Sequence, residues 1–234
     1  MPHAAAPPPG LYPPLVNFFN QDESLDIETI VQHAVRSAKS GVSGLVILGS
    51  NGEAVHMERE ERILLVSSIR KALTSEGLAD FPLIVGCGQQ SKKSTLQTIS
   101  DAKEAGGNFA LVLPPSYWPT AMTKPNVTKY FKELADESQL PVLVYNFPLV
   151  ANGVTVDSDQ LIELAGHDNI VGCKLTCGVS LFLHLLLLLF LLLPFERRLD
   201  LMSRTSETYI EQLVIPILRT LPSWLERGSS CCTV

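Results

Sequence analysis

The chain has 234 residues, of which 46% are hydrophobic and 18% are charged, and its net charge is −6. This composition predicts one large globular domain with a full apolar core. The acidic balance excludes a nucleic-acid-binding surface, because contacts to phosphates need clustered lysine and arginine. Five cysteines without a framework spacing indicate reduced thiols in a cytoplasmic protein, and no cysteine or histidine pattern predicts a metal site.

The beginning of the chain, residues 1–10, is rich in alanine and proline and is interpreted as a flexible lead-in. From Leu11 onward, short apolar runs alternate with longer amphipathic ones. The short runs predict strands over Leu11 to Phe19, Gly44 to Leu48, Pro82 to Gly86, Phe109 to Leu113, Pro141 to Tyr145 and Ile170 to Lys174. The amphipathic runs predict helices over Asp26 to Ser40, Glu58 to Leu73, Ser91 to Ala105, Lys124 to Glu137 and Ser158 to Ala165, and Gly41 is a candidate C-cap of the first.

This alternation predicts an α/β fold with parallel strands joined by helical crossovers. A doubly wound sheet and a closed (β/α)8 TIM-type barrel both fit that description. The first strand–helix turn, Phe18 to Ser24, lacks a glycine-rich phosphate fingerprint, which favours the barrel. A complete barrel has eight units, and about six are visible before the pattern ends. The prediction is therefore an incomplete TIM barrel over residues 11–178, followed by a divergent hydrophobic tail over residues 179–234.

The tail begins with a leucine-rich run, Val179 to Phe195, which has neither helical nor strand amphipathicity. Its length of about 17 residues lies at the lower limit for a membrane span. We interpret it as an aberrant tail, such as sequence read past a splice junction, rather than as a membrane anchor. The final residues, Cys231 to Val234, match a prenylation box only superficially, because the middle residues are not aliphatic.

Polar or reactive groups follow the predicted strands at the carboxyl ends, which meet at one mouth in a parallel barrel. Gly49 to Glu53 suits a tight loop whose N–H groups face an anion, although a plain polar turn also fits. Pro114 to Pro119 is a rigid aromatic loop, and Tyr145 to Pro148 ends the fifth strand. Lys174 ends the sixth. Desolvation there would lower its pKa, and a neutral amine can attack a carbonyl to form a Schiff base, whereas a solvated lysine would only end the strand.

The combination of Gly49 to Glu53, Tyr145 to Pro148 and Gly172 to Lys174 resembles the dihydrodipicolinate synthase/N-acetylneuraminate lyase family of class I aldolases. The resemblance covers residues 11–178. Within that family, Leu113 to Trp118 and Gly172 to Gly178 are similar to the fungal branch of L-threo-3-deoxy-hexulosonate aldolases and 4-hydroxy-2-oxoglutarate aldolases.

The resemblance implies a pyruvate-linked lyase that works through a Schiff base on a small 2-oxo acid, with no cofactor. Lys174 would form the imine, Tyr145 would shuttle protons to and from the substrate hydroxyl, and Ser50 and Tyr117 would complete a relay. The turn would hold the substrate carboxylate, and its substrate-binding residues are Gly49, Ser50, Asn51 and Gly52. Family members are typically dimers or tetramers, in which the tyrosine matching Tyr117 reaches into a neighbouring subunit.

Two departures from the family pattern bear on function. The synthase branch carries an arginine shortly after its Tyr-Asn-x-Pro motif, whereas Leu149 to Gly153 contains none, and this favours a keto-acid aldolase over a dihydrodipicolinate-type condensation. The last two barrel units are not visible in the tail, which would leave open strand edges. A catalytically impaired, truncated product is therefore the other expectation.

Overall fold

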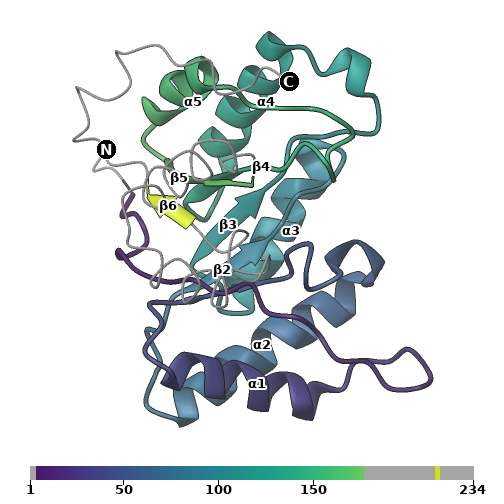
Figure 1. Cartoon of the computed structure of the whole chain (residues 1–234), viewed down its shortest axis with the longest axis vertical. Coiled ribbons are helices and arrows are strands. Elements are labelled where there is room, and N and C mark those ends of the chain that lie inside the picture. The colour runs from purple at the N-terminus through teal and green to yellow at the C-terminus, as the bar shows by residue number, and fades with distance from the viewer. Residues whose placement is uncertain (1–3, 177–213, 217–234) are drawn as a thin grey trace, which may run out of the picture.

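The computed structural model describes residues 4–176 and 214–216, in which helices and strands alternate (Figure 1). The strands are β1 (Leu45–Ile47), β2 (Leu83–Gly86), β3 (Phe109–Val112), β4 (Val142–Asn146), β5 (Ile170–Leu175) and β6 (Val214–Pro216). The helices are α1 (Ile27–Lys39), α2 (Arg59–Ser75), α3 (Lys92–Glu104), α4 (Lys124–Glu137) and α5 (Ser158–Ala165), with short 3-10 helices η1 (Ala54–His56) and η2 (Pro119–Ala121). The predicted helices, and the predicted strands from Gly44 onward, are confirmed.

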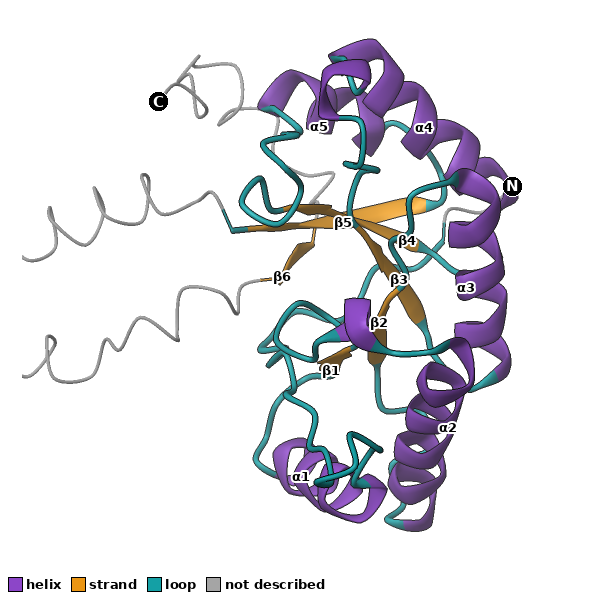
Figure 2. Ribbon diagram, turned by 90° about the vertical axis from the view of Figure 1, so that its right-hand side faces the viewer, coloured by secondary structure: helices purple, strands orange, loops and turns teal. Residues whose placement is uncertain are grey.

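The sheet grows in chain order. Strands β1 to β5 lie side by side in parallel, and β6 pairs antiparallel with β5. A sheet that adds each new strand on the same side follows barrel topology, whereas a doubly wound sheet reverses. Helices α2 to α5 form an arc along one side of this fan of strands (Figure 2). The described part is thus an incomplete barrel with five parallel strands, and the leucine-rich run lies outside the described residues.

The strand predicted over Leu11 to Phe19 is wrong. The structure has two isolated bridges there, a parallel one between Pro14 and Val46 and an antiparallel one between Phe19 and Leu25. The segment still lies beside β1, because Leu15 N–H donates to Val46 O at 2.8 Å and Val46 N–H donates to Pro13 O at 3.0 Å. Two consecutive prolines supply no N–H groups, so the ladder cannot continue along this edge.

Helix α1 shows why the amphipathic runs fold as they do. The Asp26 carboxylate accepts the Thr29 N–H at 3.0 Å and caps the first turn. One stripe of the helix, which includes Ile30 and Ala34, is buried against the sheet. The chain leaves the helix through Gly41 at φ +92°, a left-handed conformation that glycine adopts without strain, which confirms the predicted end.

Both faces of the sheet are buried, so its strands read as continuous apolar runs. On the outer face, residues such as Ile47, Val85 and Val144 pack against the helices. The inner face forms a second cluster, made of Tyr12, Val46, Ile84, Phe109, Leu111, Leu143, Tyr145 and Val171. The inner cluster occupies the interior of the partial barrel.

The residues expected to form a flexible lead-in make contacts with the rest of the domain. Ala4 N–H donates to Asp168 O at 3.2 Å, and the buried Tyr12 hydroxyl donates to Pro8 O.

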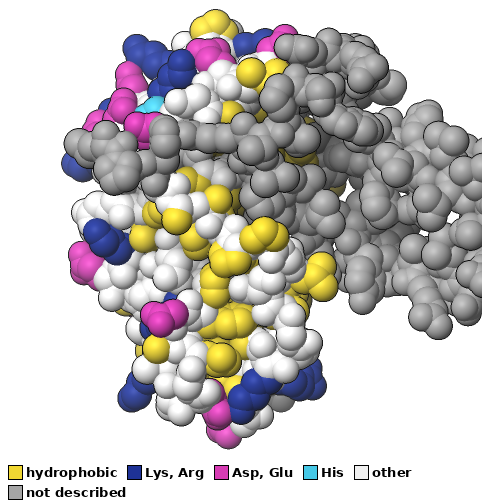
Figure 3. Space-filling view, turned by 90° about the vertical axis from the view of Figure 1, so that its left-hand side faces the viewer, with side chains coloured by type: hydrophobic (Ala, Val, Ile, Leu, Met, Phe, Trp, Pro, Cys, Tyr) yellow, Lys and Arg dark blue, Asp and Glu magenta, His cyan; other side chains and the backbone are white. Residues whose placement is uncertain are grey.

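On the side opposite the view in Figure 2, hydrophobic side chains gather along a strip of the surface (Figure 3). Among the residues that the structure describes, no helix is long and apolar enough to cross a membrane.

Candidate active site

A lysine–tyrosine pair is buried between the two neighbouring strands β4 and β5. Tyr145 and Lys174 are directly paired in the strand register. The Lys174 Nζ donates a hydrogen bond to the Tyr145 hydroxyl at 2.7 Å and lies 4.0 Å from the centroid of the tyrosine ring. The side chains are 4% and 3% exposed. The structure therefore brings together the two residues that were expected to carry the chemistry.

A β-bulge directs Lys174 into the barrel. Val142 pairs with Ile170, but Leu143 pairs with Gly172, so β5 contains one extra residue. Ile170 faces the helices, and strict alternation from it would point residue 174 to that same outer face. The extra residue changes this parity, and Lys174 therefore shares the inner face with Tyr145. The periodicity of the sequence alone does not reveal this shift.

The environment of Lys174 suits a reactive amine. Removing an ammonium group from water is costly unless it is paired or hydrogen-bonded, and here a phenol oxygen accepts its hydrogen bond. A phenol can both accept and donate a proton, so the pair combines a nucleophile with a candidate acid–base group at contact distance. Such an arrangement can form an imine with a carbonyl compound and move a proton beside it.

The loop that follows β1 forms the expected tight turn. Leu48 and Glu53 adopt left-handed conformations, with φ of +54° and +52°. Inside the turn, Gly52 N–H donates to Gly49 O and Glu53 N–H donates to Ser50 O, each at 3.1 Å. Within the described residues, these bonds leave the backbone N–H groups of Ser50 and Asn51 without a backbone acceptor. Two adjacent N–H donors at the carboxyl edge of a sheet can bind a carboxylate.

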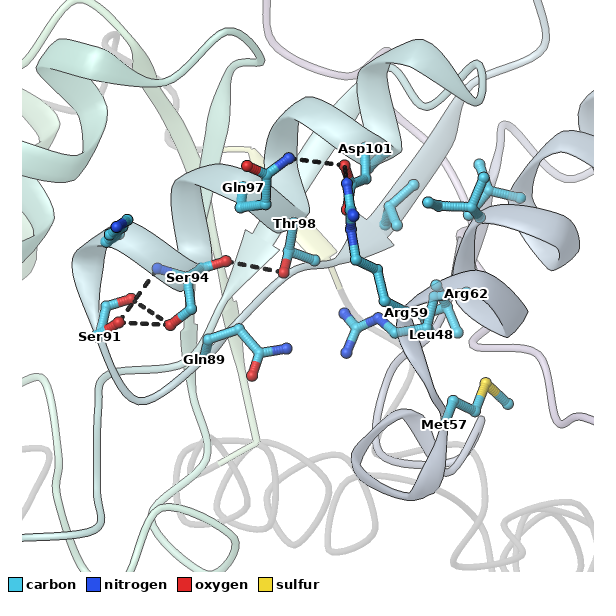
Figure 4. A pocket seen from close by; sticks show the side chains of 15 residues that line it. Leu48, Met57, Arg59, Arg62, Gln89, Ser91, Ser94, Gln97, Thr98 and Asp101 are labelled. Atoms are coloured by element: carbon cyan, nitrogen blue, oxygen red, sulfur yellow. Dashed lines mark hydrogen bonds and ion pairs between the residues drawn. The ribbon is translucent and has the colours of Figure 1, made fainter.

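Residues that sequence reasoning missed hold this turn in place. The Asn17 side-chain amide donates to Gly52 O at 2.5 Å. Arg62 of α2 reaches Ala54 O, just beyond the turn, and Gly86 O at the end of β2. Behind the turn, α2 and α3 enclose a cavity of about 420 Å³, and Leu48, Met57 and Arg62 are among its lining residues (Figure 4). Nothing in the sequence around Asn17 or Arg62 indicates that these side chains bond to backbone groups so distant along the chain.

The aromatic loop presents Tyr117 and Trp118 to the outside. Their side chains are 69% and 70% exposed and meet edge to face at 5.1 Å between ring centroids. The loop is fixed from two sides. The Gln90 Oε1 accepts the N–H groups of Ser116 and Tyr117 at 2.8 and 2.9 Å, and the Asn152 side chain donates to Ser116 O at 2.9 Å. Ser50 is likewise exposed on its own loop, so the proposed relay through Ser50 and Tyr117 stays a prediction.

Asn146 connects β4, β5 and the next loop. Its buried side-chain Oδ1 accepts Val156 N–H at 3.0 Å, and its backbone carbonyl accepts the Thr176 hydroxyl at 2.9 Å. The residue directly follows Tyr145, so these bonds fix the strand end on which the tyrosine stands. The sequence placed Asn146 in the motif Tyr145 to Pro148, but it did not indicate that the residue joins β4 to β5 and to the next loop.

In the described part, the metal-ligating and thiol side chains do not form a second reactive site. The residues of this part include no group of three or more histidine, cysteine, aspartate or glutamate side chains placed to hold a metal ion. Cys87 and Cys173 are both buried. Desolvation raises the pKa of the Cys87 thiol to about 12, so this thiol is protonated and unreactive at neutral pH.

A buried lysine at the carboxyl end of a strand, inside an unbroken row of parallel strand–helix units, defines a lysine-centred site of the TIM-barrel class. The chain belongs to the dihydrodipicolinate synthetase family, whose sequence model matches residues 7–186. The family predicted from the three strand-end motifs is therefore confirmed.

Curated relatives resemble the fungal branch. The chain is 48% identical over 170 residues to a protein of Emericella nidulans named 4-hydroxy-2-oxoglutarate aldolase, mitochondrial, with 73% of this chain and 55% of that protein covered. It is 45% identical over 172 residues to the L-threo-3-deoxy-hexylosonate aldolase of Hypocrea jecorina, with 73% and 55% covered. The chain thus spans about half the length of the curated relatives that it matches.

Solved structures show the same fold. A dihydrodipicolinate synthase family protein from Coccidioides immitis matches with a TM-score of 0.67 and 41% identity, over 74% of this chain and 53% of that one. The Escherichia coli family member YagE, solved in complex with pyruvate, matches with a TM-score of 0.60 and 29% identity, over 70% and 53%. The TIM-barrel class is therefore established for the described part.

Proposed function

We propose that the protein is a class I aldolase, a lyase that cleaves a 2-keto-3-deoxy sugar acid or a 4-hydroxy-2-oxo acid to pyruvate and an aldehyde. With 4-hydroxy-2-oxoglutarate, the aldehyde product is glyoxylate. The single observation that carries the proposal is the 2.7 Å hydrogen bond between the Lys174 amine and the Tyr145 hydroxyl inside the partial barrel. The names of the fungal relatives support the substrate class.

The reaction begins when the Lys174 amine adds to the 2-oxo carbon, and loss of water gives a protonated imine. Tyr145 takes the proton of the 4-hydroxyl group, the electron pair of that O–H bond forms the aldehyde carbonyl, and the C3–C4 bond breaks. The electrons of the broken bond move into the imine, which acts as an electron sink. Protonation of C3 and hydrolysis then release pyruvate and restore the free amine. No cofactor takes part in these steps.

The remaining groups position the substrate in this scheme. The backbone N–H groups of Ser50 and Asn51 bind the carboxylate next to the 2-oxo group, and Gly49 and Gly52 permit the turn. Ser50 and Tyr117 extend the proton path from Tyr145. The partner is a small 2-oxo acid, and we place the reaction in the cytoplasm of a homo-oligomeric enzyme. Gel filtration tests the oligomeric state. Cell fractionation tests the compartment, for which the mitochondrial name of the Emericella relative offers the other outcome.

A condensation of the dihydrodipicolinate type is the alternative. The chain is 28% identical over 225 residues to the 4-hydroxy-tetrahydrodipicolinate synthase of Natronomonas pharaonis. Leu149 to Gly153, which follows the Tyr145 strand end, holds no arginine for the carboxylate of a second substrate, and Leu149 is 85% exposed. This difference supports cleavage over condensation.

Activity of the full chain tests the proposal. Pyruvate release is measured with 4-hydroxy-2-oxoglutarate and with L-threo-3-deoxy-hexulosonate, beside condensation of pyruvate with a carboxylate-bearing aldehyde. We expect cleavage that disappears in Lys174→Met and persists in Lys132→Ala, a surface lysine paired with Glu163. A folded chain that releases no pyruvate from either acid would overturn the proposal and support a catalytically impaired product. Condensation without cleavage would establish the alternative.

A further inference from the structure

Two partly buried arginines lie on the same helix, at opposite ends of the sheet. Arg62 and Arg70 both belong to α2 and both donate to backbone carbonyl groups. Desolvation lowers the pKa of each guanidinium group, the effect expected when such a group is withdrawn from water. Their targets differ. Arg62 faces the carboxyl ends of the strands, where the lysine–tyrosine pair lies, whereas Arg70 faces the amino ends.

Arg62 connects the end of β2 to the loop after β1. Its Nη2 donates to Gly86 O at 2.9 Å, and its Nη1 donates to Ala54 O at 3.5 Å. Gly86 is the last residue of β2, and Ala54 directly follows the turn Gly49 to Glu53. In the close view of the cavity, Arg62 lies beside Leu48, the residue from which the turn departs (Figure 4).

The two segments that Arg62 connects are in close contact. A Cβ atom on Gly86 would lie 1.7 Å from Leu48 O, so only glycine allows the turn to pass this close to β2. Leu48 itself is held at φ +54°, which is unfavourable for a leucine. A strained departure of this kind persists only where surrounding contacts fix it. Arg62 supplies such contacts from outside the turn.

Arg70 makes a larger set of hydrogen bonds than Arg62, and none of them touches the turn. It donates to Gly106 O at 2.9 Å, to Ala79 O at 2.7 Å and to Phe81 O at 2.9 Å. These carbonyl groups precede β2 and β3. Arg70 therefore secures the amino ends of the strands, and it provides a matched control on the same helix.

Arg59 provides a second control, for charge. It lines the same cavity as Arg62 (Figure 4), but its guanidinium group is occupied by the Asp101 carboxylate through bonds of 2.6 and 2.7 Å. If positive charge in this region attracted an anionic substrate, Arg59 and Arg62 would contribute alike. If contacts to the loop matter, only Arg62 contributes.

We propose that Arg62 is a positioning residue that holds the carboxylate-binding turn Gly49 to Glu53 against the end of β2, so that its N–H groups are preorganised for the 2-oxo acid. The proposal rests on the function proposed above. A preorganised turn loses less conformational entropy when the substrate binds. Removal of Arg62 therefore weakens substrate binding and leaves the chemistry of Lys174 and Tyr145 intact.

The first test measures the rate at which borohydride traps pyruvate on the full chain, as a function of pyruvate concentration. Arg62→Gln is expected to raise the half-saturating concentration about tenfold, as loss of a charged hydrogen bond does, with the rate at saturation changed less than about twofold. Arg62→Lys, which keeps a charged donor, is expected to raise the half-saturating concentration less than Arg62→Gln does. Arg59→Gln and Arg70→Gln leave the half-saturating concentration unchanged, and Arg70→Gln lowers the melting temperature. Equal effects of Arg59→Gln and Arg62→Gln would overturn the proposal.

The second test needs no activity. Amide hydrogen exchange at Gly52, Glu53 and Ala54 is expected to accelerate in Arg62→Gln and to stay at the wild-type rate in Arg70→Gln. Unchanged exchange in Arg62→Gln would overturn the proposal. A wild-type chain that forms no adduct with pyruvate would instead refute the proposed function, and exchange would still decide the role of Arg62.

Discussion

The two ends of the parallel strands are built differently. At the carboxyl ends, the backbone is strained at Leu48, Glu53 and Asn152, each with positive φ, and a lysine and a tyrosine are buried together. Polar side chains bond to backbone groups at both ends, as Arg70 does at the amino ends and Arg62 does at the carboxyl ends. Strain and buried ionisable groups reduce stability and are retained where they serve a function. We therefore expect the carboxyl end to carry the proposed chemistry and the amino end mainly to stabilise the fold, as in TIM barrels generally.

Replacement of Lys174 by methionine should abolish catalysis while leaving stability nearly unchanged, and it is the largest effect that we expect. Methionine fills a similar volume without a charge, so the free energy of unfolding should change by less than about 1.5 kcal/mol. Removal of the nucleophile should lower kcat by at least about a thousandfold. Aldol cleavage and thermal unfolding are measured on the same sample. A large loss of stability with residual cleavage would contradict the division between the two ends.

Tyr145→Phe should affect proton transfer but not imine formation. The ring remains in the inner cluster, so packing is conserved, while the acid–base group is lost. We expect kcat for cleavage to fall by about a hundredfold to ten-thousandfold. Trapping of pyruvate by borohydride should persist. An unaffected kcat would show that another group transfers the proton.

At the amino end, Asn108→Ala should reduce stability and spare activity. The Asn108 Oδ1 accepts Leu83 N–H at 2.9 Å and the Arg70 Nη2 at 2.6 Å. Loss of this acceptor leaves a donor of β2 unpaired and should cost about 1–3 kcal/mol. Chemical denaturation measures the cost, and kcat/KM should stay at the wild-type value. Asn108→Asp keeps an acceptor and is the control.

Gln90 offers a smaller test at the carboxyl end. Gln90→Met conserves length but removes the oxygen that accepts the Ser116 and Tyr117 N–H groups, whereas Gln90→Glu keeps it. If the aromatic loop takes part in the proton path, kcat should fall about threefold to tenfold in the methionine variant alone. Equal activity of both variants would remove the loop from the mechanism.

The smallest expected effect concerns pH. A hydrogen bond from Lys124, followed by one from Gln160 N–H, lowers the pKa of Asp157 at the start of α5. The stabilisation is therefore present above the ordinary aspartate pKa and is lost as the pH falls through the lowered value. Because Lys124 is largely exposed, Asp157→Asn should cost less than about 1 kcal/mol near neutral pH and should reduce the loss of stability on acidification. Urea unfolding across the acidic range measures this.

Much of the fold, and the strand ends that form the candidate site, could be predicted from the sequence. Apolar runs located the strands closely, as Ile170 to Lys174 against the observed Ile170–Leu175 shows. Parallel topology predicted that the strand ends carrying Tyr145 and Lys174 lie at the same edge of the sheet, but the face that Lys174 occupies depends on the bulge in β5. The failed first strand shows the limit of the approach, since an apolar segment with prolines can lie beside a sheet without joining its ladder.

The supporting contacts could not be predicted in the same way. Arg62, Gln90 and Asn17 act through side-chain bonds to backbone groups that are 8 to 35 residues distant in sequence. Such bonds depend on how loops from different units meet, which no local pattern encodes. The bulge in β5 was hidden for a related reason, because register is set by the neighbouring strand rather than by the strand itself.

The most direct test of the account is to locate the covalent adduct. The full chain is incubated with pyruvate, reduced with borohydride, digested and mapped by mass spectrometry. The account predicts a single modified position, Lys174, with no adduct in Lys174→Met and a retained adduct in Tyr145→Phe. An adduct on a different lysine, or one that persists in Lys174→Met, would contradict it.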